Sequence, residues 1–335
     1  YYIYMGVIDH SITYTFFFAL SLVYLLIYFL PVYLSILKNN VVKLSLLSRI
    51  ILFGLSIVLA FNGPLIPGLV LITCPLILIY YWSNFLKNNY SDDFIKNALN
   101  ALGNVPLQLI YLFAFAMILC GYSLYIGFNN AENFNAVIPV LNRYMNLPSG
   151  LFDMLTTKIG FPLLIIAIAC NYYLILKNAD DDFKSQINKV MLFIMVFCII
   201  YILLLPLGGY RIYRPNIVRR DTFLPVTICM FIIFGYSSLT VMKLVKQRVN
   251  TIYASFMILL LLIFTLADKS INENTCEREA INELAASKEK IVLIKSDCNI
   301  MSWEKITDYR NSQHNAQLLY YLKITRQEQL YFSSP

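Results

Sequence analysis

Residues 190–207 read VMLFIMVFCIIYILLLPL, and residues 208–221 continue as GGYRIYRPNIVRRD. The first stretch contains no charged residue and, as a helix, is long enough to cross a hydrocarbon core about 30 Å thick. The second stretch places four arginines, two tyrosines and one aspartate in a short connection. Because another apolar run begins at Thr222, we predict a membrane-spanning helix that ends in a cationic loop.

The composition of the whole chain indicates a polytopic helical membrane protein. Of its 335 residues, 59% are hydrophobic and only 13% are charged, whereas soluble domains average about 25% charged residues. We predict an all-α bundle of about eight spans, over residues 12–36, 46–61, 65–82, 106–128, 161–176, 190–207, 222–242 and 251–267. Asn62, Gly63 and Pro64 predict a tight turn between the second and third spans, which could instead form a re-entrant hairpin. The first span follows Tyr1 so closely that we expect an N-terminal truncation.

The distribution of basic residues predicts the orientation of these spans. Cytoplasmic connections of membrane proteins are richer in Lys and Arg than the opposite ones. Successive connections between the predicted spans lie on alternate sides of the membrane, so they form two sets. One set contains eleven basic residues, which are Lys38, Lys43, Arg49, Lys87, Lys96, Lys177, Lys184, Lys189, Lys243, Lys246 and Arg248. The other set contains six, which are Arg143, Lys158, Arg211, Arg214, Arg219 and Arg220. We therefore predict that residues 129–160, residues 208–221 and the C-terminal tail lie outside the cytoplasm.

The tail, residues 269–335, has the composition of a soluble domain, with nine Lys/Arg and nine Asp/Glu. We predict a membrane domain over residues 1–268 and a small α/β domain over residues 269–335. In the latter we expect a helix over 274–290 and strands over 290–295 and 318–324. Cys276 and Cys298 could form a disulfide there if the compartment is oxidising.

The connection of residues 129–160 is unusually long for a bundle. Apolar positions recur between residues 137 and 155 and are interrupted by Pro148. This pattern predicts one or two short helices at the membrane interface, and an irregular covering loop fits it equally well.

The cationic loop is the strongest candidate for a binding site. The guanidinium group keeps its charge and pairs bidentately with phosphate, and the tyrosines could lie at the headgroup level or stack on a sugar. The alternative is that the arginines bind bulk anionic headgroups or pair with Asp221 and the tail. The candidate residues for binding a lipid phosphate are Arg211, Arg214, Arg219, Arg220, Tyr210 and Tyr213.

Two carboxylates are candidates for a general base on the same side of the membrane. Asp9 lies beside His10 just before the first span, and Asp153 lies in the 129–160 connection. Either could accept a proton from an attacking hydroxyl, or could be an ordinary polar residue at a membrane boundary. No residues stand out as metal ligands or as a cofactor site, although a requirement for a divalent metal is left open. We predict no nucleic-acid partner, because the basic residues are dispersed along the chain. The scarcity of ionisable residues inside the spans argues against an ion-coupled transporter.

This arrangement resembles the GT-C class of membrane glycosyltransferases. The resemblance rests on many spans, a late outward loop (Gly208-Gly209-Tyr210-Arg211-Ile212-Tyr213-Arg214-Pro215), outer amphipathic segments and a small outward C-terminal domain. It implies a bacterial cytoplasmic-membrane enzyme that moves a sugar from a polyprenyl-phosphate-linked donor to a glycan or lipid acceptor. Membrane lipids are further expected partners, and the resemblance implies Asp9 or Asp153 as the catalytic carboxylate.

Two other functions remain open at this point. One is a polymerase or ligase of lipid-linked surface polysaccharide, which also uses outward arginines but does not need a catalytic aspartate. The other is a non-enzymatic component of membrane transport or a membrane scaffold.

Overall fold

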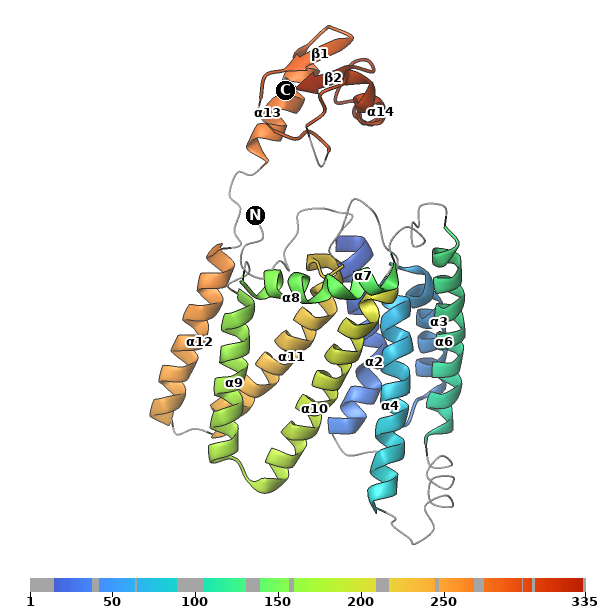
Figure 1. Cartoon of the computed structure of the whole chain (residues 1–335). Coiled ribbons are helices and arrows are strands. Elements are labelled where there is room, and N and C mark those ends of the chain that lie inside the picture. Colours follow the sequence, from blue (N-terminus) through green and yellow to red (C-terminus); the bar gives the residue numbers. More distant parts are fainter. Residues whose placement is uncertain are drawn as a thin grey trace. The chain divides into compact units, whose positions relative to one another are not determined.

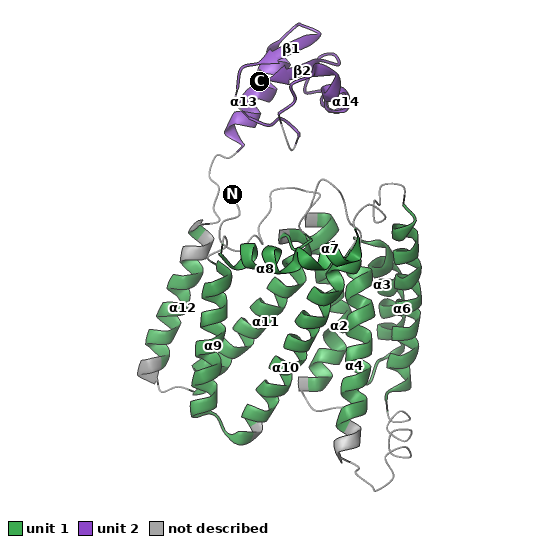
Figure 2. Ribbon diagram, viewed as in Figure 1, with its two compact units in different colours: residues 1–268 green, residues 269–335 purple. Residues whose placement is uncertain are grey.

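The computed structural model of the chain describes residues 15–37, 42–63, 65–88, 105–130, 139–156, 160–208, 217–244, 247–267, 274–296, 298–302 and 305–333. The chain divides into two compact units, residues 1–268 and residues 269–335 (Figure 2). We call them the helical unit and the C-terminal unit, and each is described by itself.

Long helices of alternating direction form the helical unit (Figure 1). The two shortest of its described α-helices, α7 and α8, lie across one end of the bundle, within the 129–160 connection where the sequence left short helices or a covering loop open. We call this the α7–α8 end. In chain order the elements are the π-helix η1 (Thr15–Leu20), α2 (Ser21–Leu37), α3 (Leu46–Phe61), α4 (Ile66–Asn88), α6 (Leu107–Phe128), α7 (Val140–Met145), α8 (Leu147–Thr156), α9 (Gly160–Asn178), α10 (Asp181–Leu204), the 3-10 helix η2 (Leu205–Leu207), α11 (Arg220–Leu244) and α12 (Gln247–Ala267).

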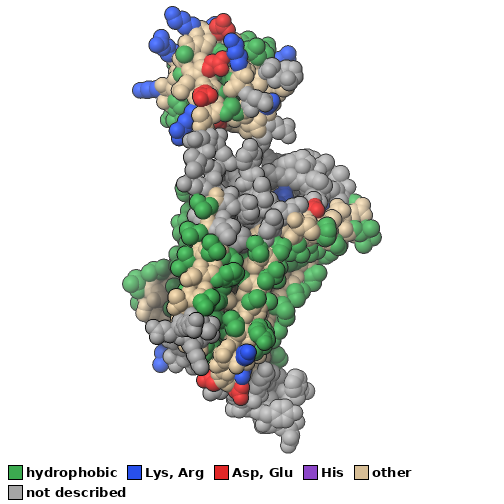
Figure 3. All heavy atoms as spheres, turned by 90° about the vertical axis from the view of Figure 1, so that its left-hand side faces the viewer, with side chains coloured by type: hydrophobic (Ala, Val, Ile, Leu, Met, Phe, Trp, Pro, Cys, Tyr) green, Lys and Arg blue, Asp and Glu red, His purple; other side chains and the backbone are tan. Residues whose placement is uncertain are grey.

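Six helices in the described part of the chain are long and apolar enough to cross a membrane, which confirms an integral membrane protein. Two shorter apolar helices, Leu46–Phe61 and Asn250–Leu262, occupy the places of the other predicted spans, so eight spans remain a prediction. Hydrophobic side chains cover the flank of the helical unit that faces the viewer in Figure 3. The six candidate spans are Phe16–Ile36, Ile66–Asn84, Leu107–Phe128, Gly160–Asn178, Phe183–Leu207 and Asp221–Leu244.

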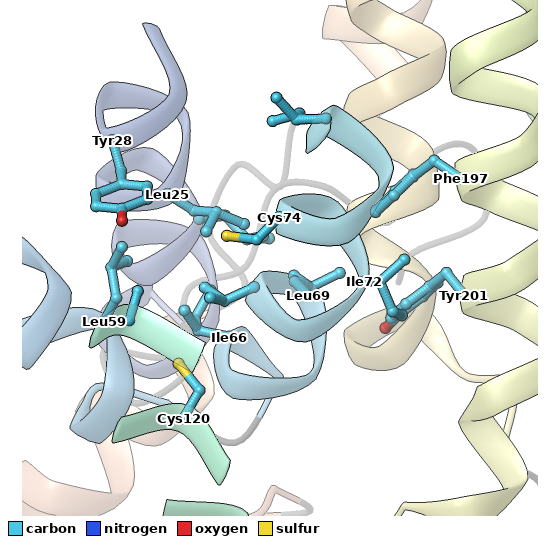
Figure 4. Packing of buried hydrophobic residues seen from close by; sticks show 14 of the residues in the cluster. Leu25, Tyr28, Leu59, Ile66, Leu69, Ile72, Cys74, Cys120, Phe197 and Tyr201 are labelled. Carbon is cyan, nitrogen blue, oxygen red and sulfur yellow. The ribbon is translucent and has the colours of Figure 1, made fainter. Parts of the chain in front are cut away.

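Helix α4 lies at the centre of the main apolar cluster. Its residues Leu69 and Cys74 are fully buried. Figure 4 shows Tyr28 of α2 on one side of α4 and Phe197 and Tyr201 of α10 on the other. Since lipid chains are as apolar as leucine, close packing rather than exclusion from water stabilises such contacts in a bilayer.

The predicted turn between α3 and α4 is confirmed. Gly63 adopts a φ of +90°, a left-handed conformation that favours glycine. A Cβ atom at this position would lie 2.3 Å from the carbonyl oxygen of Phe17. The close approach therefore ties the end of α3 to the start of η1, at the α7–α8 end of the bundle.

A buried polar network joins three helices at the side chain of Asn171, in α9. Its Nδ2 donates to the hydroxyls of Ser237 and Ser238 in α11, each at 3.0 Å, and its Oδ1 accepts from the Tyr253 hydroxyl in α12 at 2.7 Å. Asn171 is fully buried. Because an unpaired amide is costly in hydrocarbon, this network specifies how α9, α11 and α12 pair.

In its described residues, the C-terminal unit contains a two-stranded parallel sheet and two α-helices. Its elements are α13 (Thr275–Ala286), β1 (Ile291–Ile294), the 3-10 helix η3 (Tyr309–Ser312), α14 (Gln313–Tyr321) and β2 (Leu330–Ser333). Strand β1 pairs with β2 in the register Ile291 with Leu330 through Ile294 with Ser333. Its core contains Ala280, Leu284, Val292, Ile294, Ile300, Leu319 and Tyr331.

The predicted helix and first strand of this unit are confirmed in shorter form, whereas the predicted strand over residues 318–324 is wrong. That stretch is the end of α14 and the turn after it. Ala316 and Leu319 are buried three positions apart, which is helical spacing. Lys323 then adopts a φ of 59°, and Ile324 N donates to the Leu319 oxygen at 3.0 Å, which is the pattern of a Schellman cap.

The disulfide between Cys276 and Cys298, which the sequence left open, is present. It joins α13 to the segment after β1, and the two Cα atoms are 6.0 Å apart. It therefore links the helix to the sheet in a unit with a small core.

Candidate functional site

The candidate site lies at the α7–α8 end, where α10 ends in η2 and α11 begins (Figure 1). These two ends flank the cationic loop. The structure describes residue 208 and residues 217–221 of that loop, and the site is built from them and from α7 and α8.

Hydrogen bonds around Thr222 determine where α11 starts. The Thr222 hydroxyl donates to the Ile217 carbonyl oxygen at 2.6 Å and accepts from the Arg219 backbone N–H at 2.9 Å. The Tyr201 hydroxyl of α10 donates to the Thr222 carbonyl oxygen at 2.6 Å. The exit of the cationic loop is therefore attached both to its own helix and to α10.

Arg219 forms a bidentate ion pair with Asp221. Its Nε donates to Oδ1 at 2.9 Å and its Nη2 donates to Oδ2 at 2.8 Å. The side chain of Arg219 is 30% exposed and that of Asp221 is 14% exposed. Charge-assisted pairs of this geometry are about twice as strong as neutral hydrogen bonds. This is the pairing with Asp221 that the sequence left open, and it makes Arg219 less available to a ligand than an unpaired arginine.

Arg143, on α7, is a buried cation at the same end. It is only 5% exposed, and its Nη1 donates to the Pro206 carbonyl oxygen of η2 at 3.4 Å. The neighbouring Tyr144 hydroxyl donates to the Leu203 carbonyl oxygen at 2.9 Å. Burying an ion without compensating partners costs roughly several kcal/mol, even after the protein relaxes around it. The fold nevertheless keeps the positive charge of Arg143 inside this end of the bundle.

In the sequence, Arg143 is only one of the basic residues predicted to face outward. It is a single arginine among the apolar positions of a short amphipathic segment. That pattern does not reveal burial, because long arginine side chains can also extend to the interface. Contact with the end of α10 decides its burial.

Helix α8 packs against the exit of the cationic loop. A Cβ atom added to Gly150 would lie 3.0 Å from the Val218 Cβ. Asp153 follows Gly150 by one helical turn and is exposed. The structure therefore brings this predicted carboxylate to the same end of the bundle as Arg219 and Arg143.

The other predicted site residues are described only in part or not at all. Arg220 is the first residue of α11, and its side chain lies outside the described residues. The predictions for Asp9, Tyr210, Arg211, Tyr213 and Arg214 also fall outside the described residues. Within the described ranges, no group of three or more His, Cys, Asp or Glu side chains is arranged to hold a metal ion.

Comparisons of this chain with models of protein families, with curated proteins and with solved structures find no significant match. Functional inference therefore depends on the chemistry of the site.

Proposed function

We propose that this chain is a membrane glycosyltransferase that moves a sugar from a polyprenyl-phosphate-linked donor to a glycan or lipid acceptor on the outer side of the membrane. The observation that carries the proposal is the pair of arginines at the borders of the cationic loop. Arg143 is buried against η2, where the loop begins, and Arg219 lies at the end of the loop, just before α11. The loop between them adds Arg211 and Arg214. Several guanidinium groups at one end of a membrane bundle suit a phosphate attached to a lipid chain.

The proposed roles follow from the partners of each arginine. Arg219 is paired with Asp221 and would shape the loop. The donor phosphate and its sugar would be held by Arg211, Arg214 and Arg220, together with Tyr210 and Tyr213. Arg143, on α7, would add positive electrostatic potential at the site. The lipid chain of the donor would lie along the apolar helices.

In the proposed reaction, the acceptor hydroxyl oxygen attacks the anomeric carbon of the sugar. A carboxylate, Asp153 or Asp9, takes the hydroxyl proton. The bond between the anomeric carbon and the phosphate oxygen breaks, and the polyprenyl phosphate leaves with the electron pair. The arginines stabilise the negative charge that grows on this phosphate, which is the contribution that lowers the barrier.

The disulfide of the C-terminal unit supports the proposed orientation. Disulfides persist in oxidising compartments and are rare in the cytoplasm, so the Cys276–Cys298 bond favours a C-terminal unit outside the cytoplasm. The distribution of Lys and Arg favours the same side. In a bacterium this corresponds to an enzyme of the cytoplasmic membrane whose site faces outward.

The test is turnover of a panel of polyprenyl-phosphate sugars by the purified full-length protein. We expect the double variant Arg211→Ala, Arg214→Ala to lose about 10²-fold or more of the wild-type rate, which is the usual effect of removing a charge-stabilising donor. A matched control replaces Lys177 and Lys184, two basic residues at the opposite end of the bundle, with alanine. Absence of turnover and of binding with every donor in the panel would reject the proposal.

A further inference from the structure

An open groove between α3 and α6 lies at the end of the helical unit opposite the candidate site (Figure 1). Its volume is about 580 Å³. It is lined by Leu44, Arg49, Phe53, Leu107, Gln108, Tyr111 and Leu112. Most of the wall is therefore apolar, and among its described lining residues the ionic side chain is that of Arg49, a cation.

The cation is held in place by a chain of hydrogen bonds. Gln108 Oε1, on α6, accepts from the backbone N–H of Leu44 at 3.3 Å. The carbonyl oxygen of the same Leu44 accepts from Arg49 Nε at 3.2 Å. Leu44 itself is buried. The segment before α3 thus positions the guanidinium group at the groove.

Within the described part of the chain, the terminal nitrogens of this guanidinium group have no hydrogen-bond partner. Among the described residues, the only hydrogen bond of the Arg49 side chain is the one from Nε to Leu44, and Arg49 has no acidic partner there. Arg49 also lies in the first turn of α3, where the helix dipole favours an anion. Both features are complementary to a phosphate.

The apolar wall indicates what is attached to that phosphate. Leu107 is 60% exposed and Tyr111 is 63% exposed, on a helix that is long and apolar enough to cross a membrane. In a membrane, exposed side chains of such a helix would face lipid rather than water. A soluble anion would gain nothing from this wall, whereas an acyl chain would.

We propose that this groove is a binding site for an anionic membrane phospholipid. The headgroup phosphate pairs with the Nη groups of Arg49, and one acyl chain lies against Phe53, Tyr111 and Leu112. The site is separate from the proposed donor site, because the two lie at opposite ends of the bundle. Anionic lipids are enriched in the cytoplasmic leaflet, the side on which this end lies if the predicted orientation holds.

Native mass spectrometry of the full-length protein, delipidated in detergent, tests this site. Phosphatidylglycerol, phosphatidylcholine and inorganic phosphate are the probes. We expect wild type to retain phosphatidylglycerol in preference to phosphatidylcholine, and Arg49→Gln to bind phosphatidylglycerol about tenfold more weakly, as for loss of one charge-assisted pair. Lys177→Gln, a change of one exposed cation at the same end, is the matched control and should retain wild-type binding.

A second variant separates the headgroup from the chain. Tyr111→Ala should weaken retention of both lipids and keep the preference for phosphatidylglycerol, because it changes only the apolar wall. Each measurement is repeated with Arg211 and Arg214 replaced by alanine, so that lipid bound at the cationic loop is subtracted. Equal phosphatidylglycerol binding by wild type and Arg49→Gln would overturn the proposal, and so would displacement of the lipid by millimolar inorganic phosphate.

Discussion

Removal of the Cys276–Cys298 disulfide is expected to destabilise the C-terminal unit severely. The two cysteines are 22 positions apart in the sequence. In the chain-entropy model a closed loop of this length lowers the entropy of the unfolded state by roughly 11 cal/mol/K, or about 3 kcal/mol at 25 °C. A single core in a unit this small rarely supplies more than about 3–5 kcal/mol in total. The double variant Cys276→Ala, Cys298→Ala should therefore lose most of the free energy of unfolding.

Pulse proteolysis of the full-length protein in detergent, at increasing urea concentrations, measures this loss. With a urea dependence of about 1 kcal/mol/M for a small domain, we expect the cleavage midpoint of the C-terminal unit to fall by roughly 2–3 M. Wild type treated with a reductant should shift equally. Cys170→Ser, which removes a free and exposed cysteine of α9, is the matched control. A midpoint that moves by less than about 0.5 M in the double variant would refute the loop-closure reasoning.

Four further predictions concern single side chains. Gly63→Ala should destabilise the helical unit by about 2 kcal/mol or more in thermal unfolding, because the φ of +90° and the close carbonyl admit no Cβ; an unchanged midpoint contradicts this. Asn171→Leu should lower the free energy of unfolding by about 1 kcal/mol, because the Tyr253 hydroxyl loses its acceptor. A double-mutant cycle with Tyr253→Phe should show coupling between the two positions, and strict additivity of the two changes would contradict this role of the network. If Asp153 is the general base, Asp153→Asn should abolish donor turnover; because the residue is exposed, stability should change by no more than about 0.5 kcal/mol. Full activity of this variant would assign the role of base to Asp9. Burial raises the pKa of Tyr331 above its ordinary value. As the pH rises above about 10, the unfolded state releases the phenolic proton before the folded state does, so the C-terminal unit should lose stability. Tyr331→Phe should remove this part of the pH dependence.

The helices of the membrane unit were predictable because a span leaves a long, local signal. About twenty apolar residues in succession can satisfy their backbone only as a helix in lipid. The turn at Gly63 was also predicted from local residues. For residues 129–160 the sequence left short helices and a covering loop equally open, and the structure shows the helices α7 and α8. The strand over residues 318–324 was predicted wrongly, since a short apolar stretch does not distinguish strand from helix without its contacts. Leu319 points into the core on a helix because α13 and β1 lie there.

The candidate site was predictable in composition and not in geometry. The sequence proposed the cationic loop and Asp153 as candidates, and of these the structure describes Asp153 and the two ends of the loop. The sequence did not identify Arg143 as buried, because burial depends on α7 lying across the end of α10, far away in the chain. The sequence also left the partner of Arg219 open. In the structure, Asp221 lies at the start of α11, where its carboxylate accepts two hydrogen bonds from the Arg219 guanidinium group.

Composition and hydrophobic runs by themselves determined that this chain is a helical membrane protein with a small tail of soluble composition, because these properties depend only on the transfer of local segments between water and lipid. Tertiary structure alone decided which polar groups meet across helices. The Asn171 network, the buried Arg143 and the groove at Arg49 each join helices that are distant in sequence. Packing brings such groups together at distances where desolvation makes each pairing strong, and no periodicity along the chain encodes those distances.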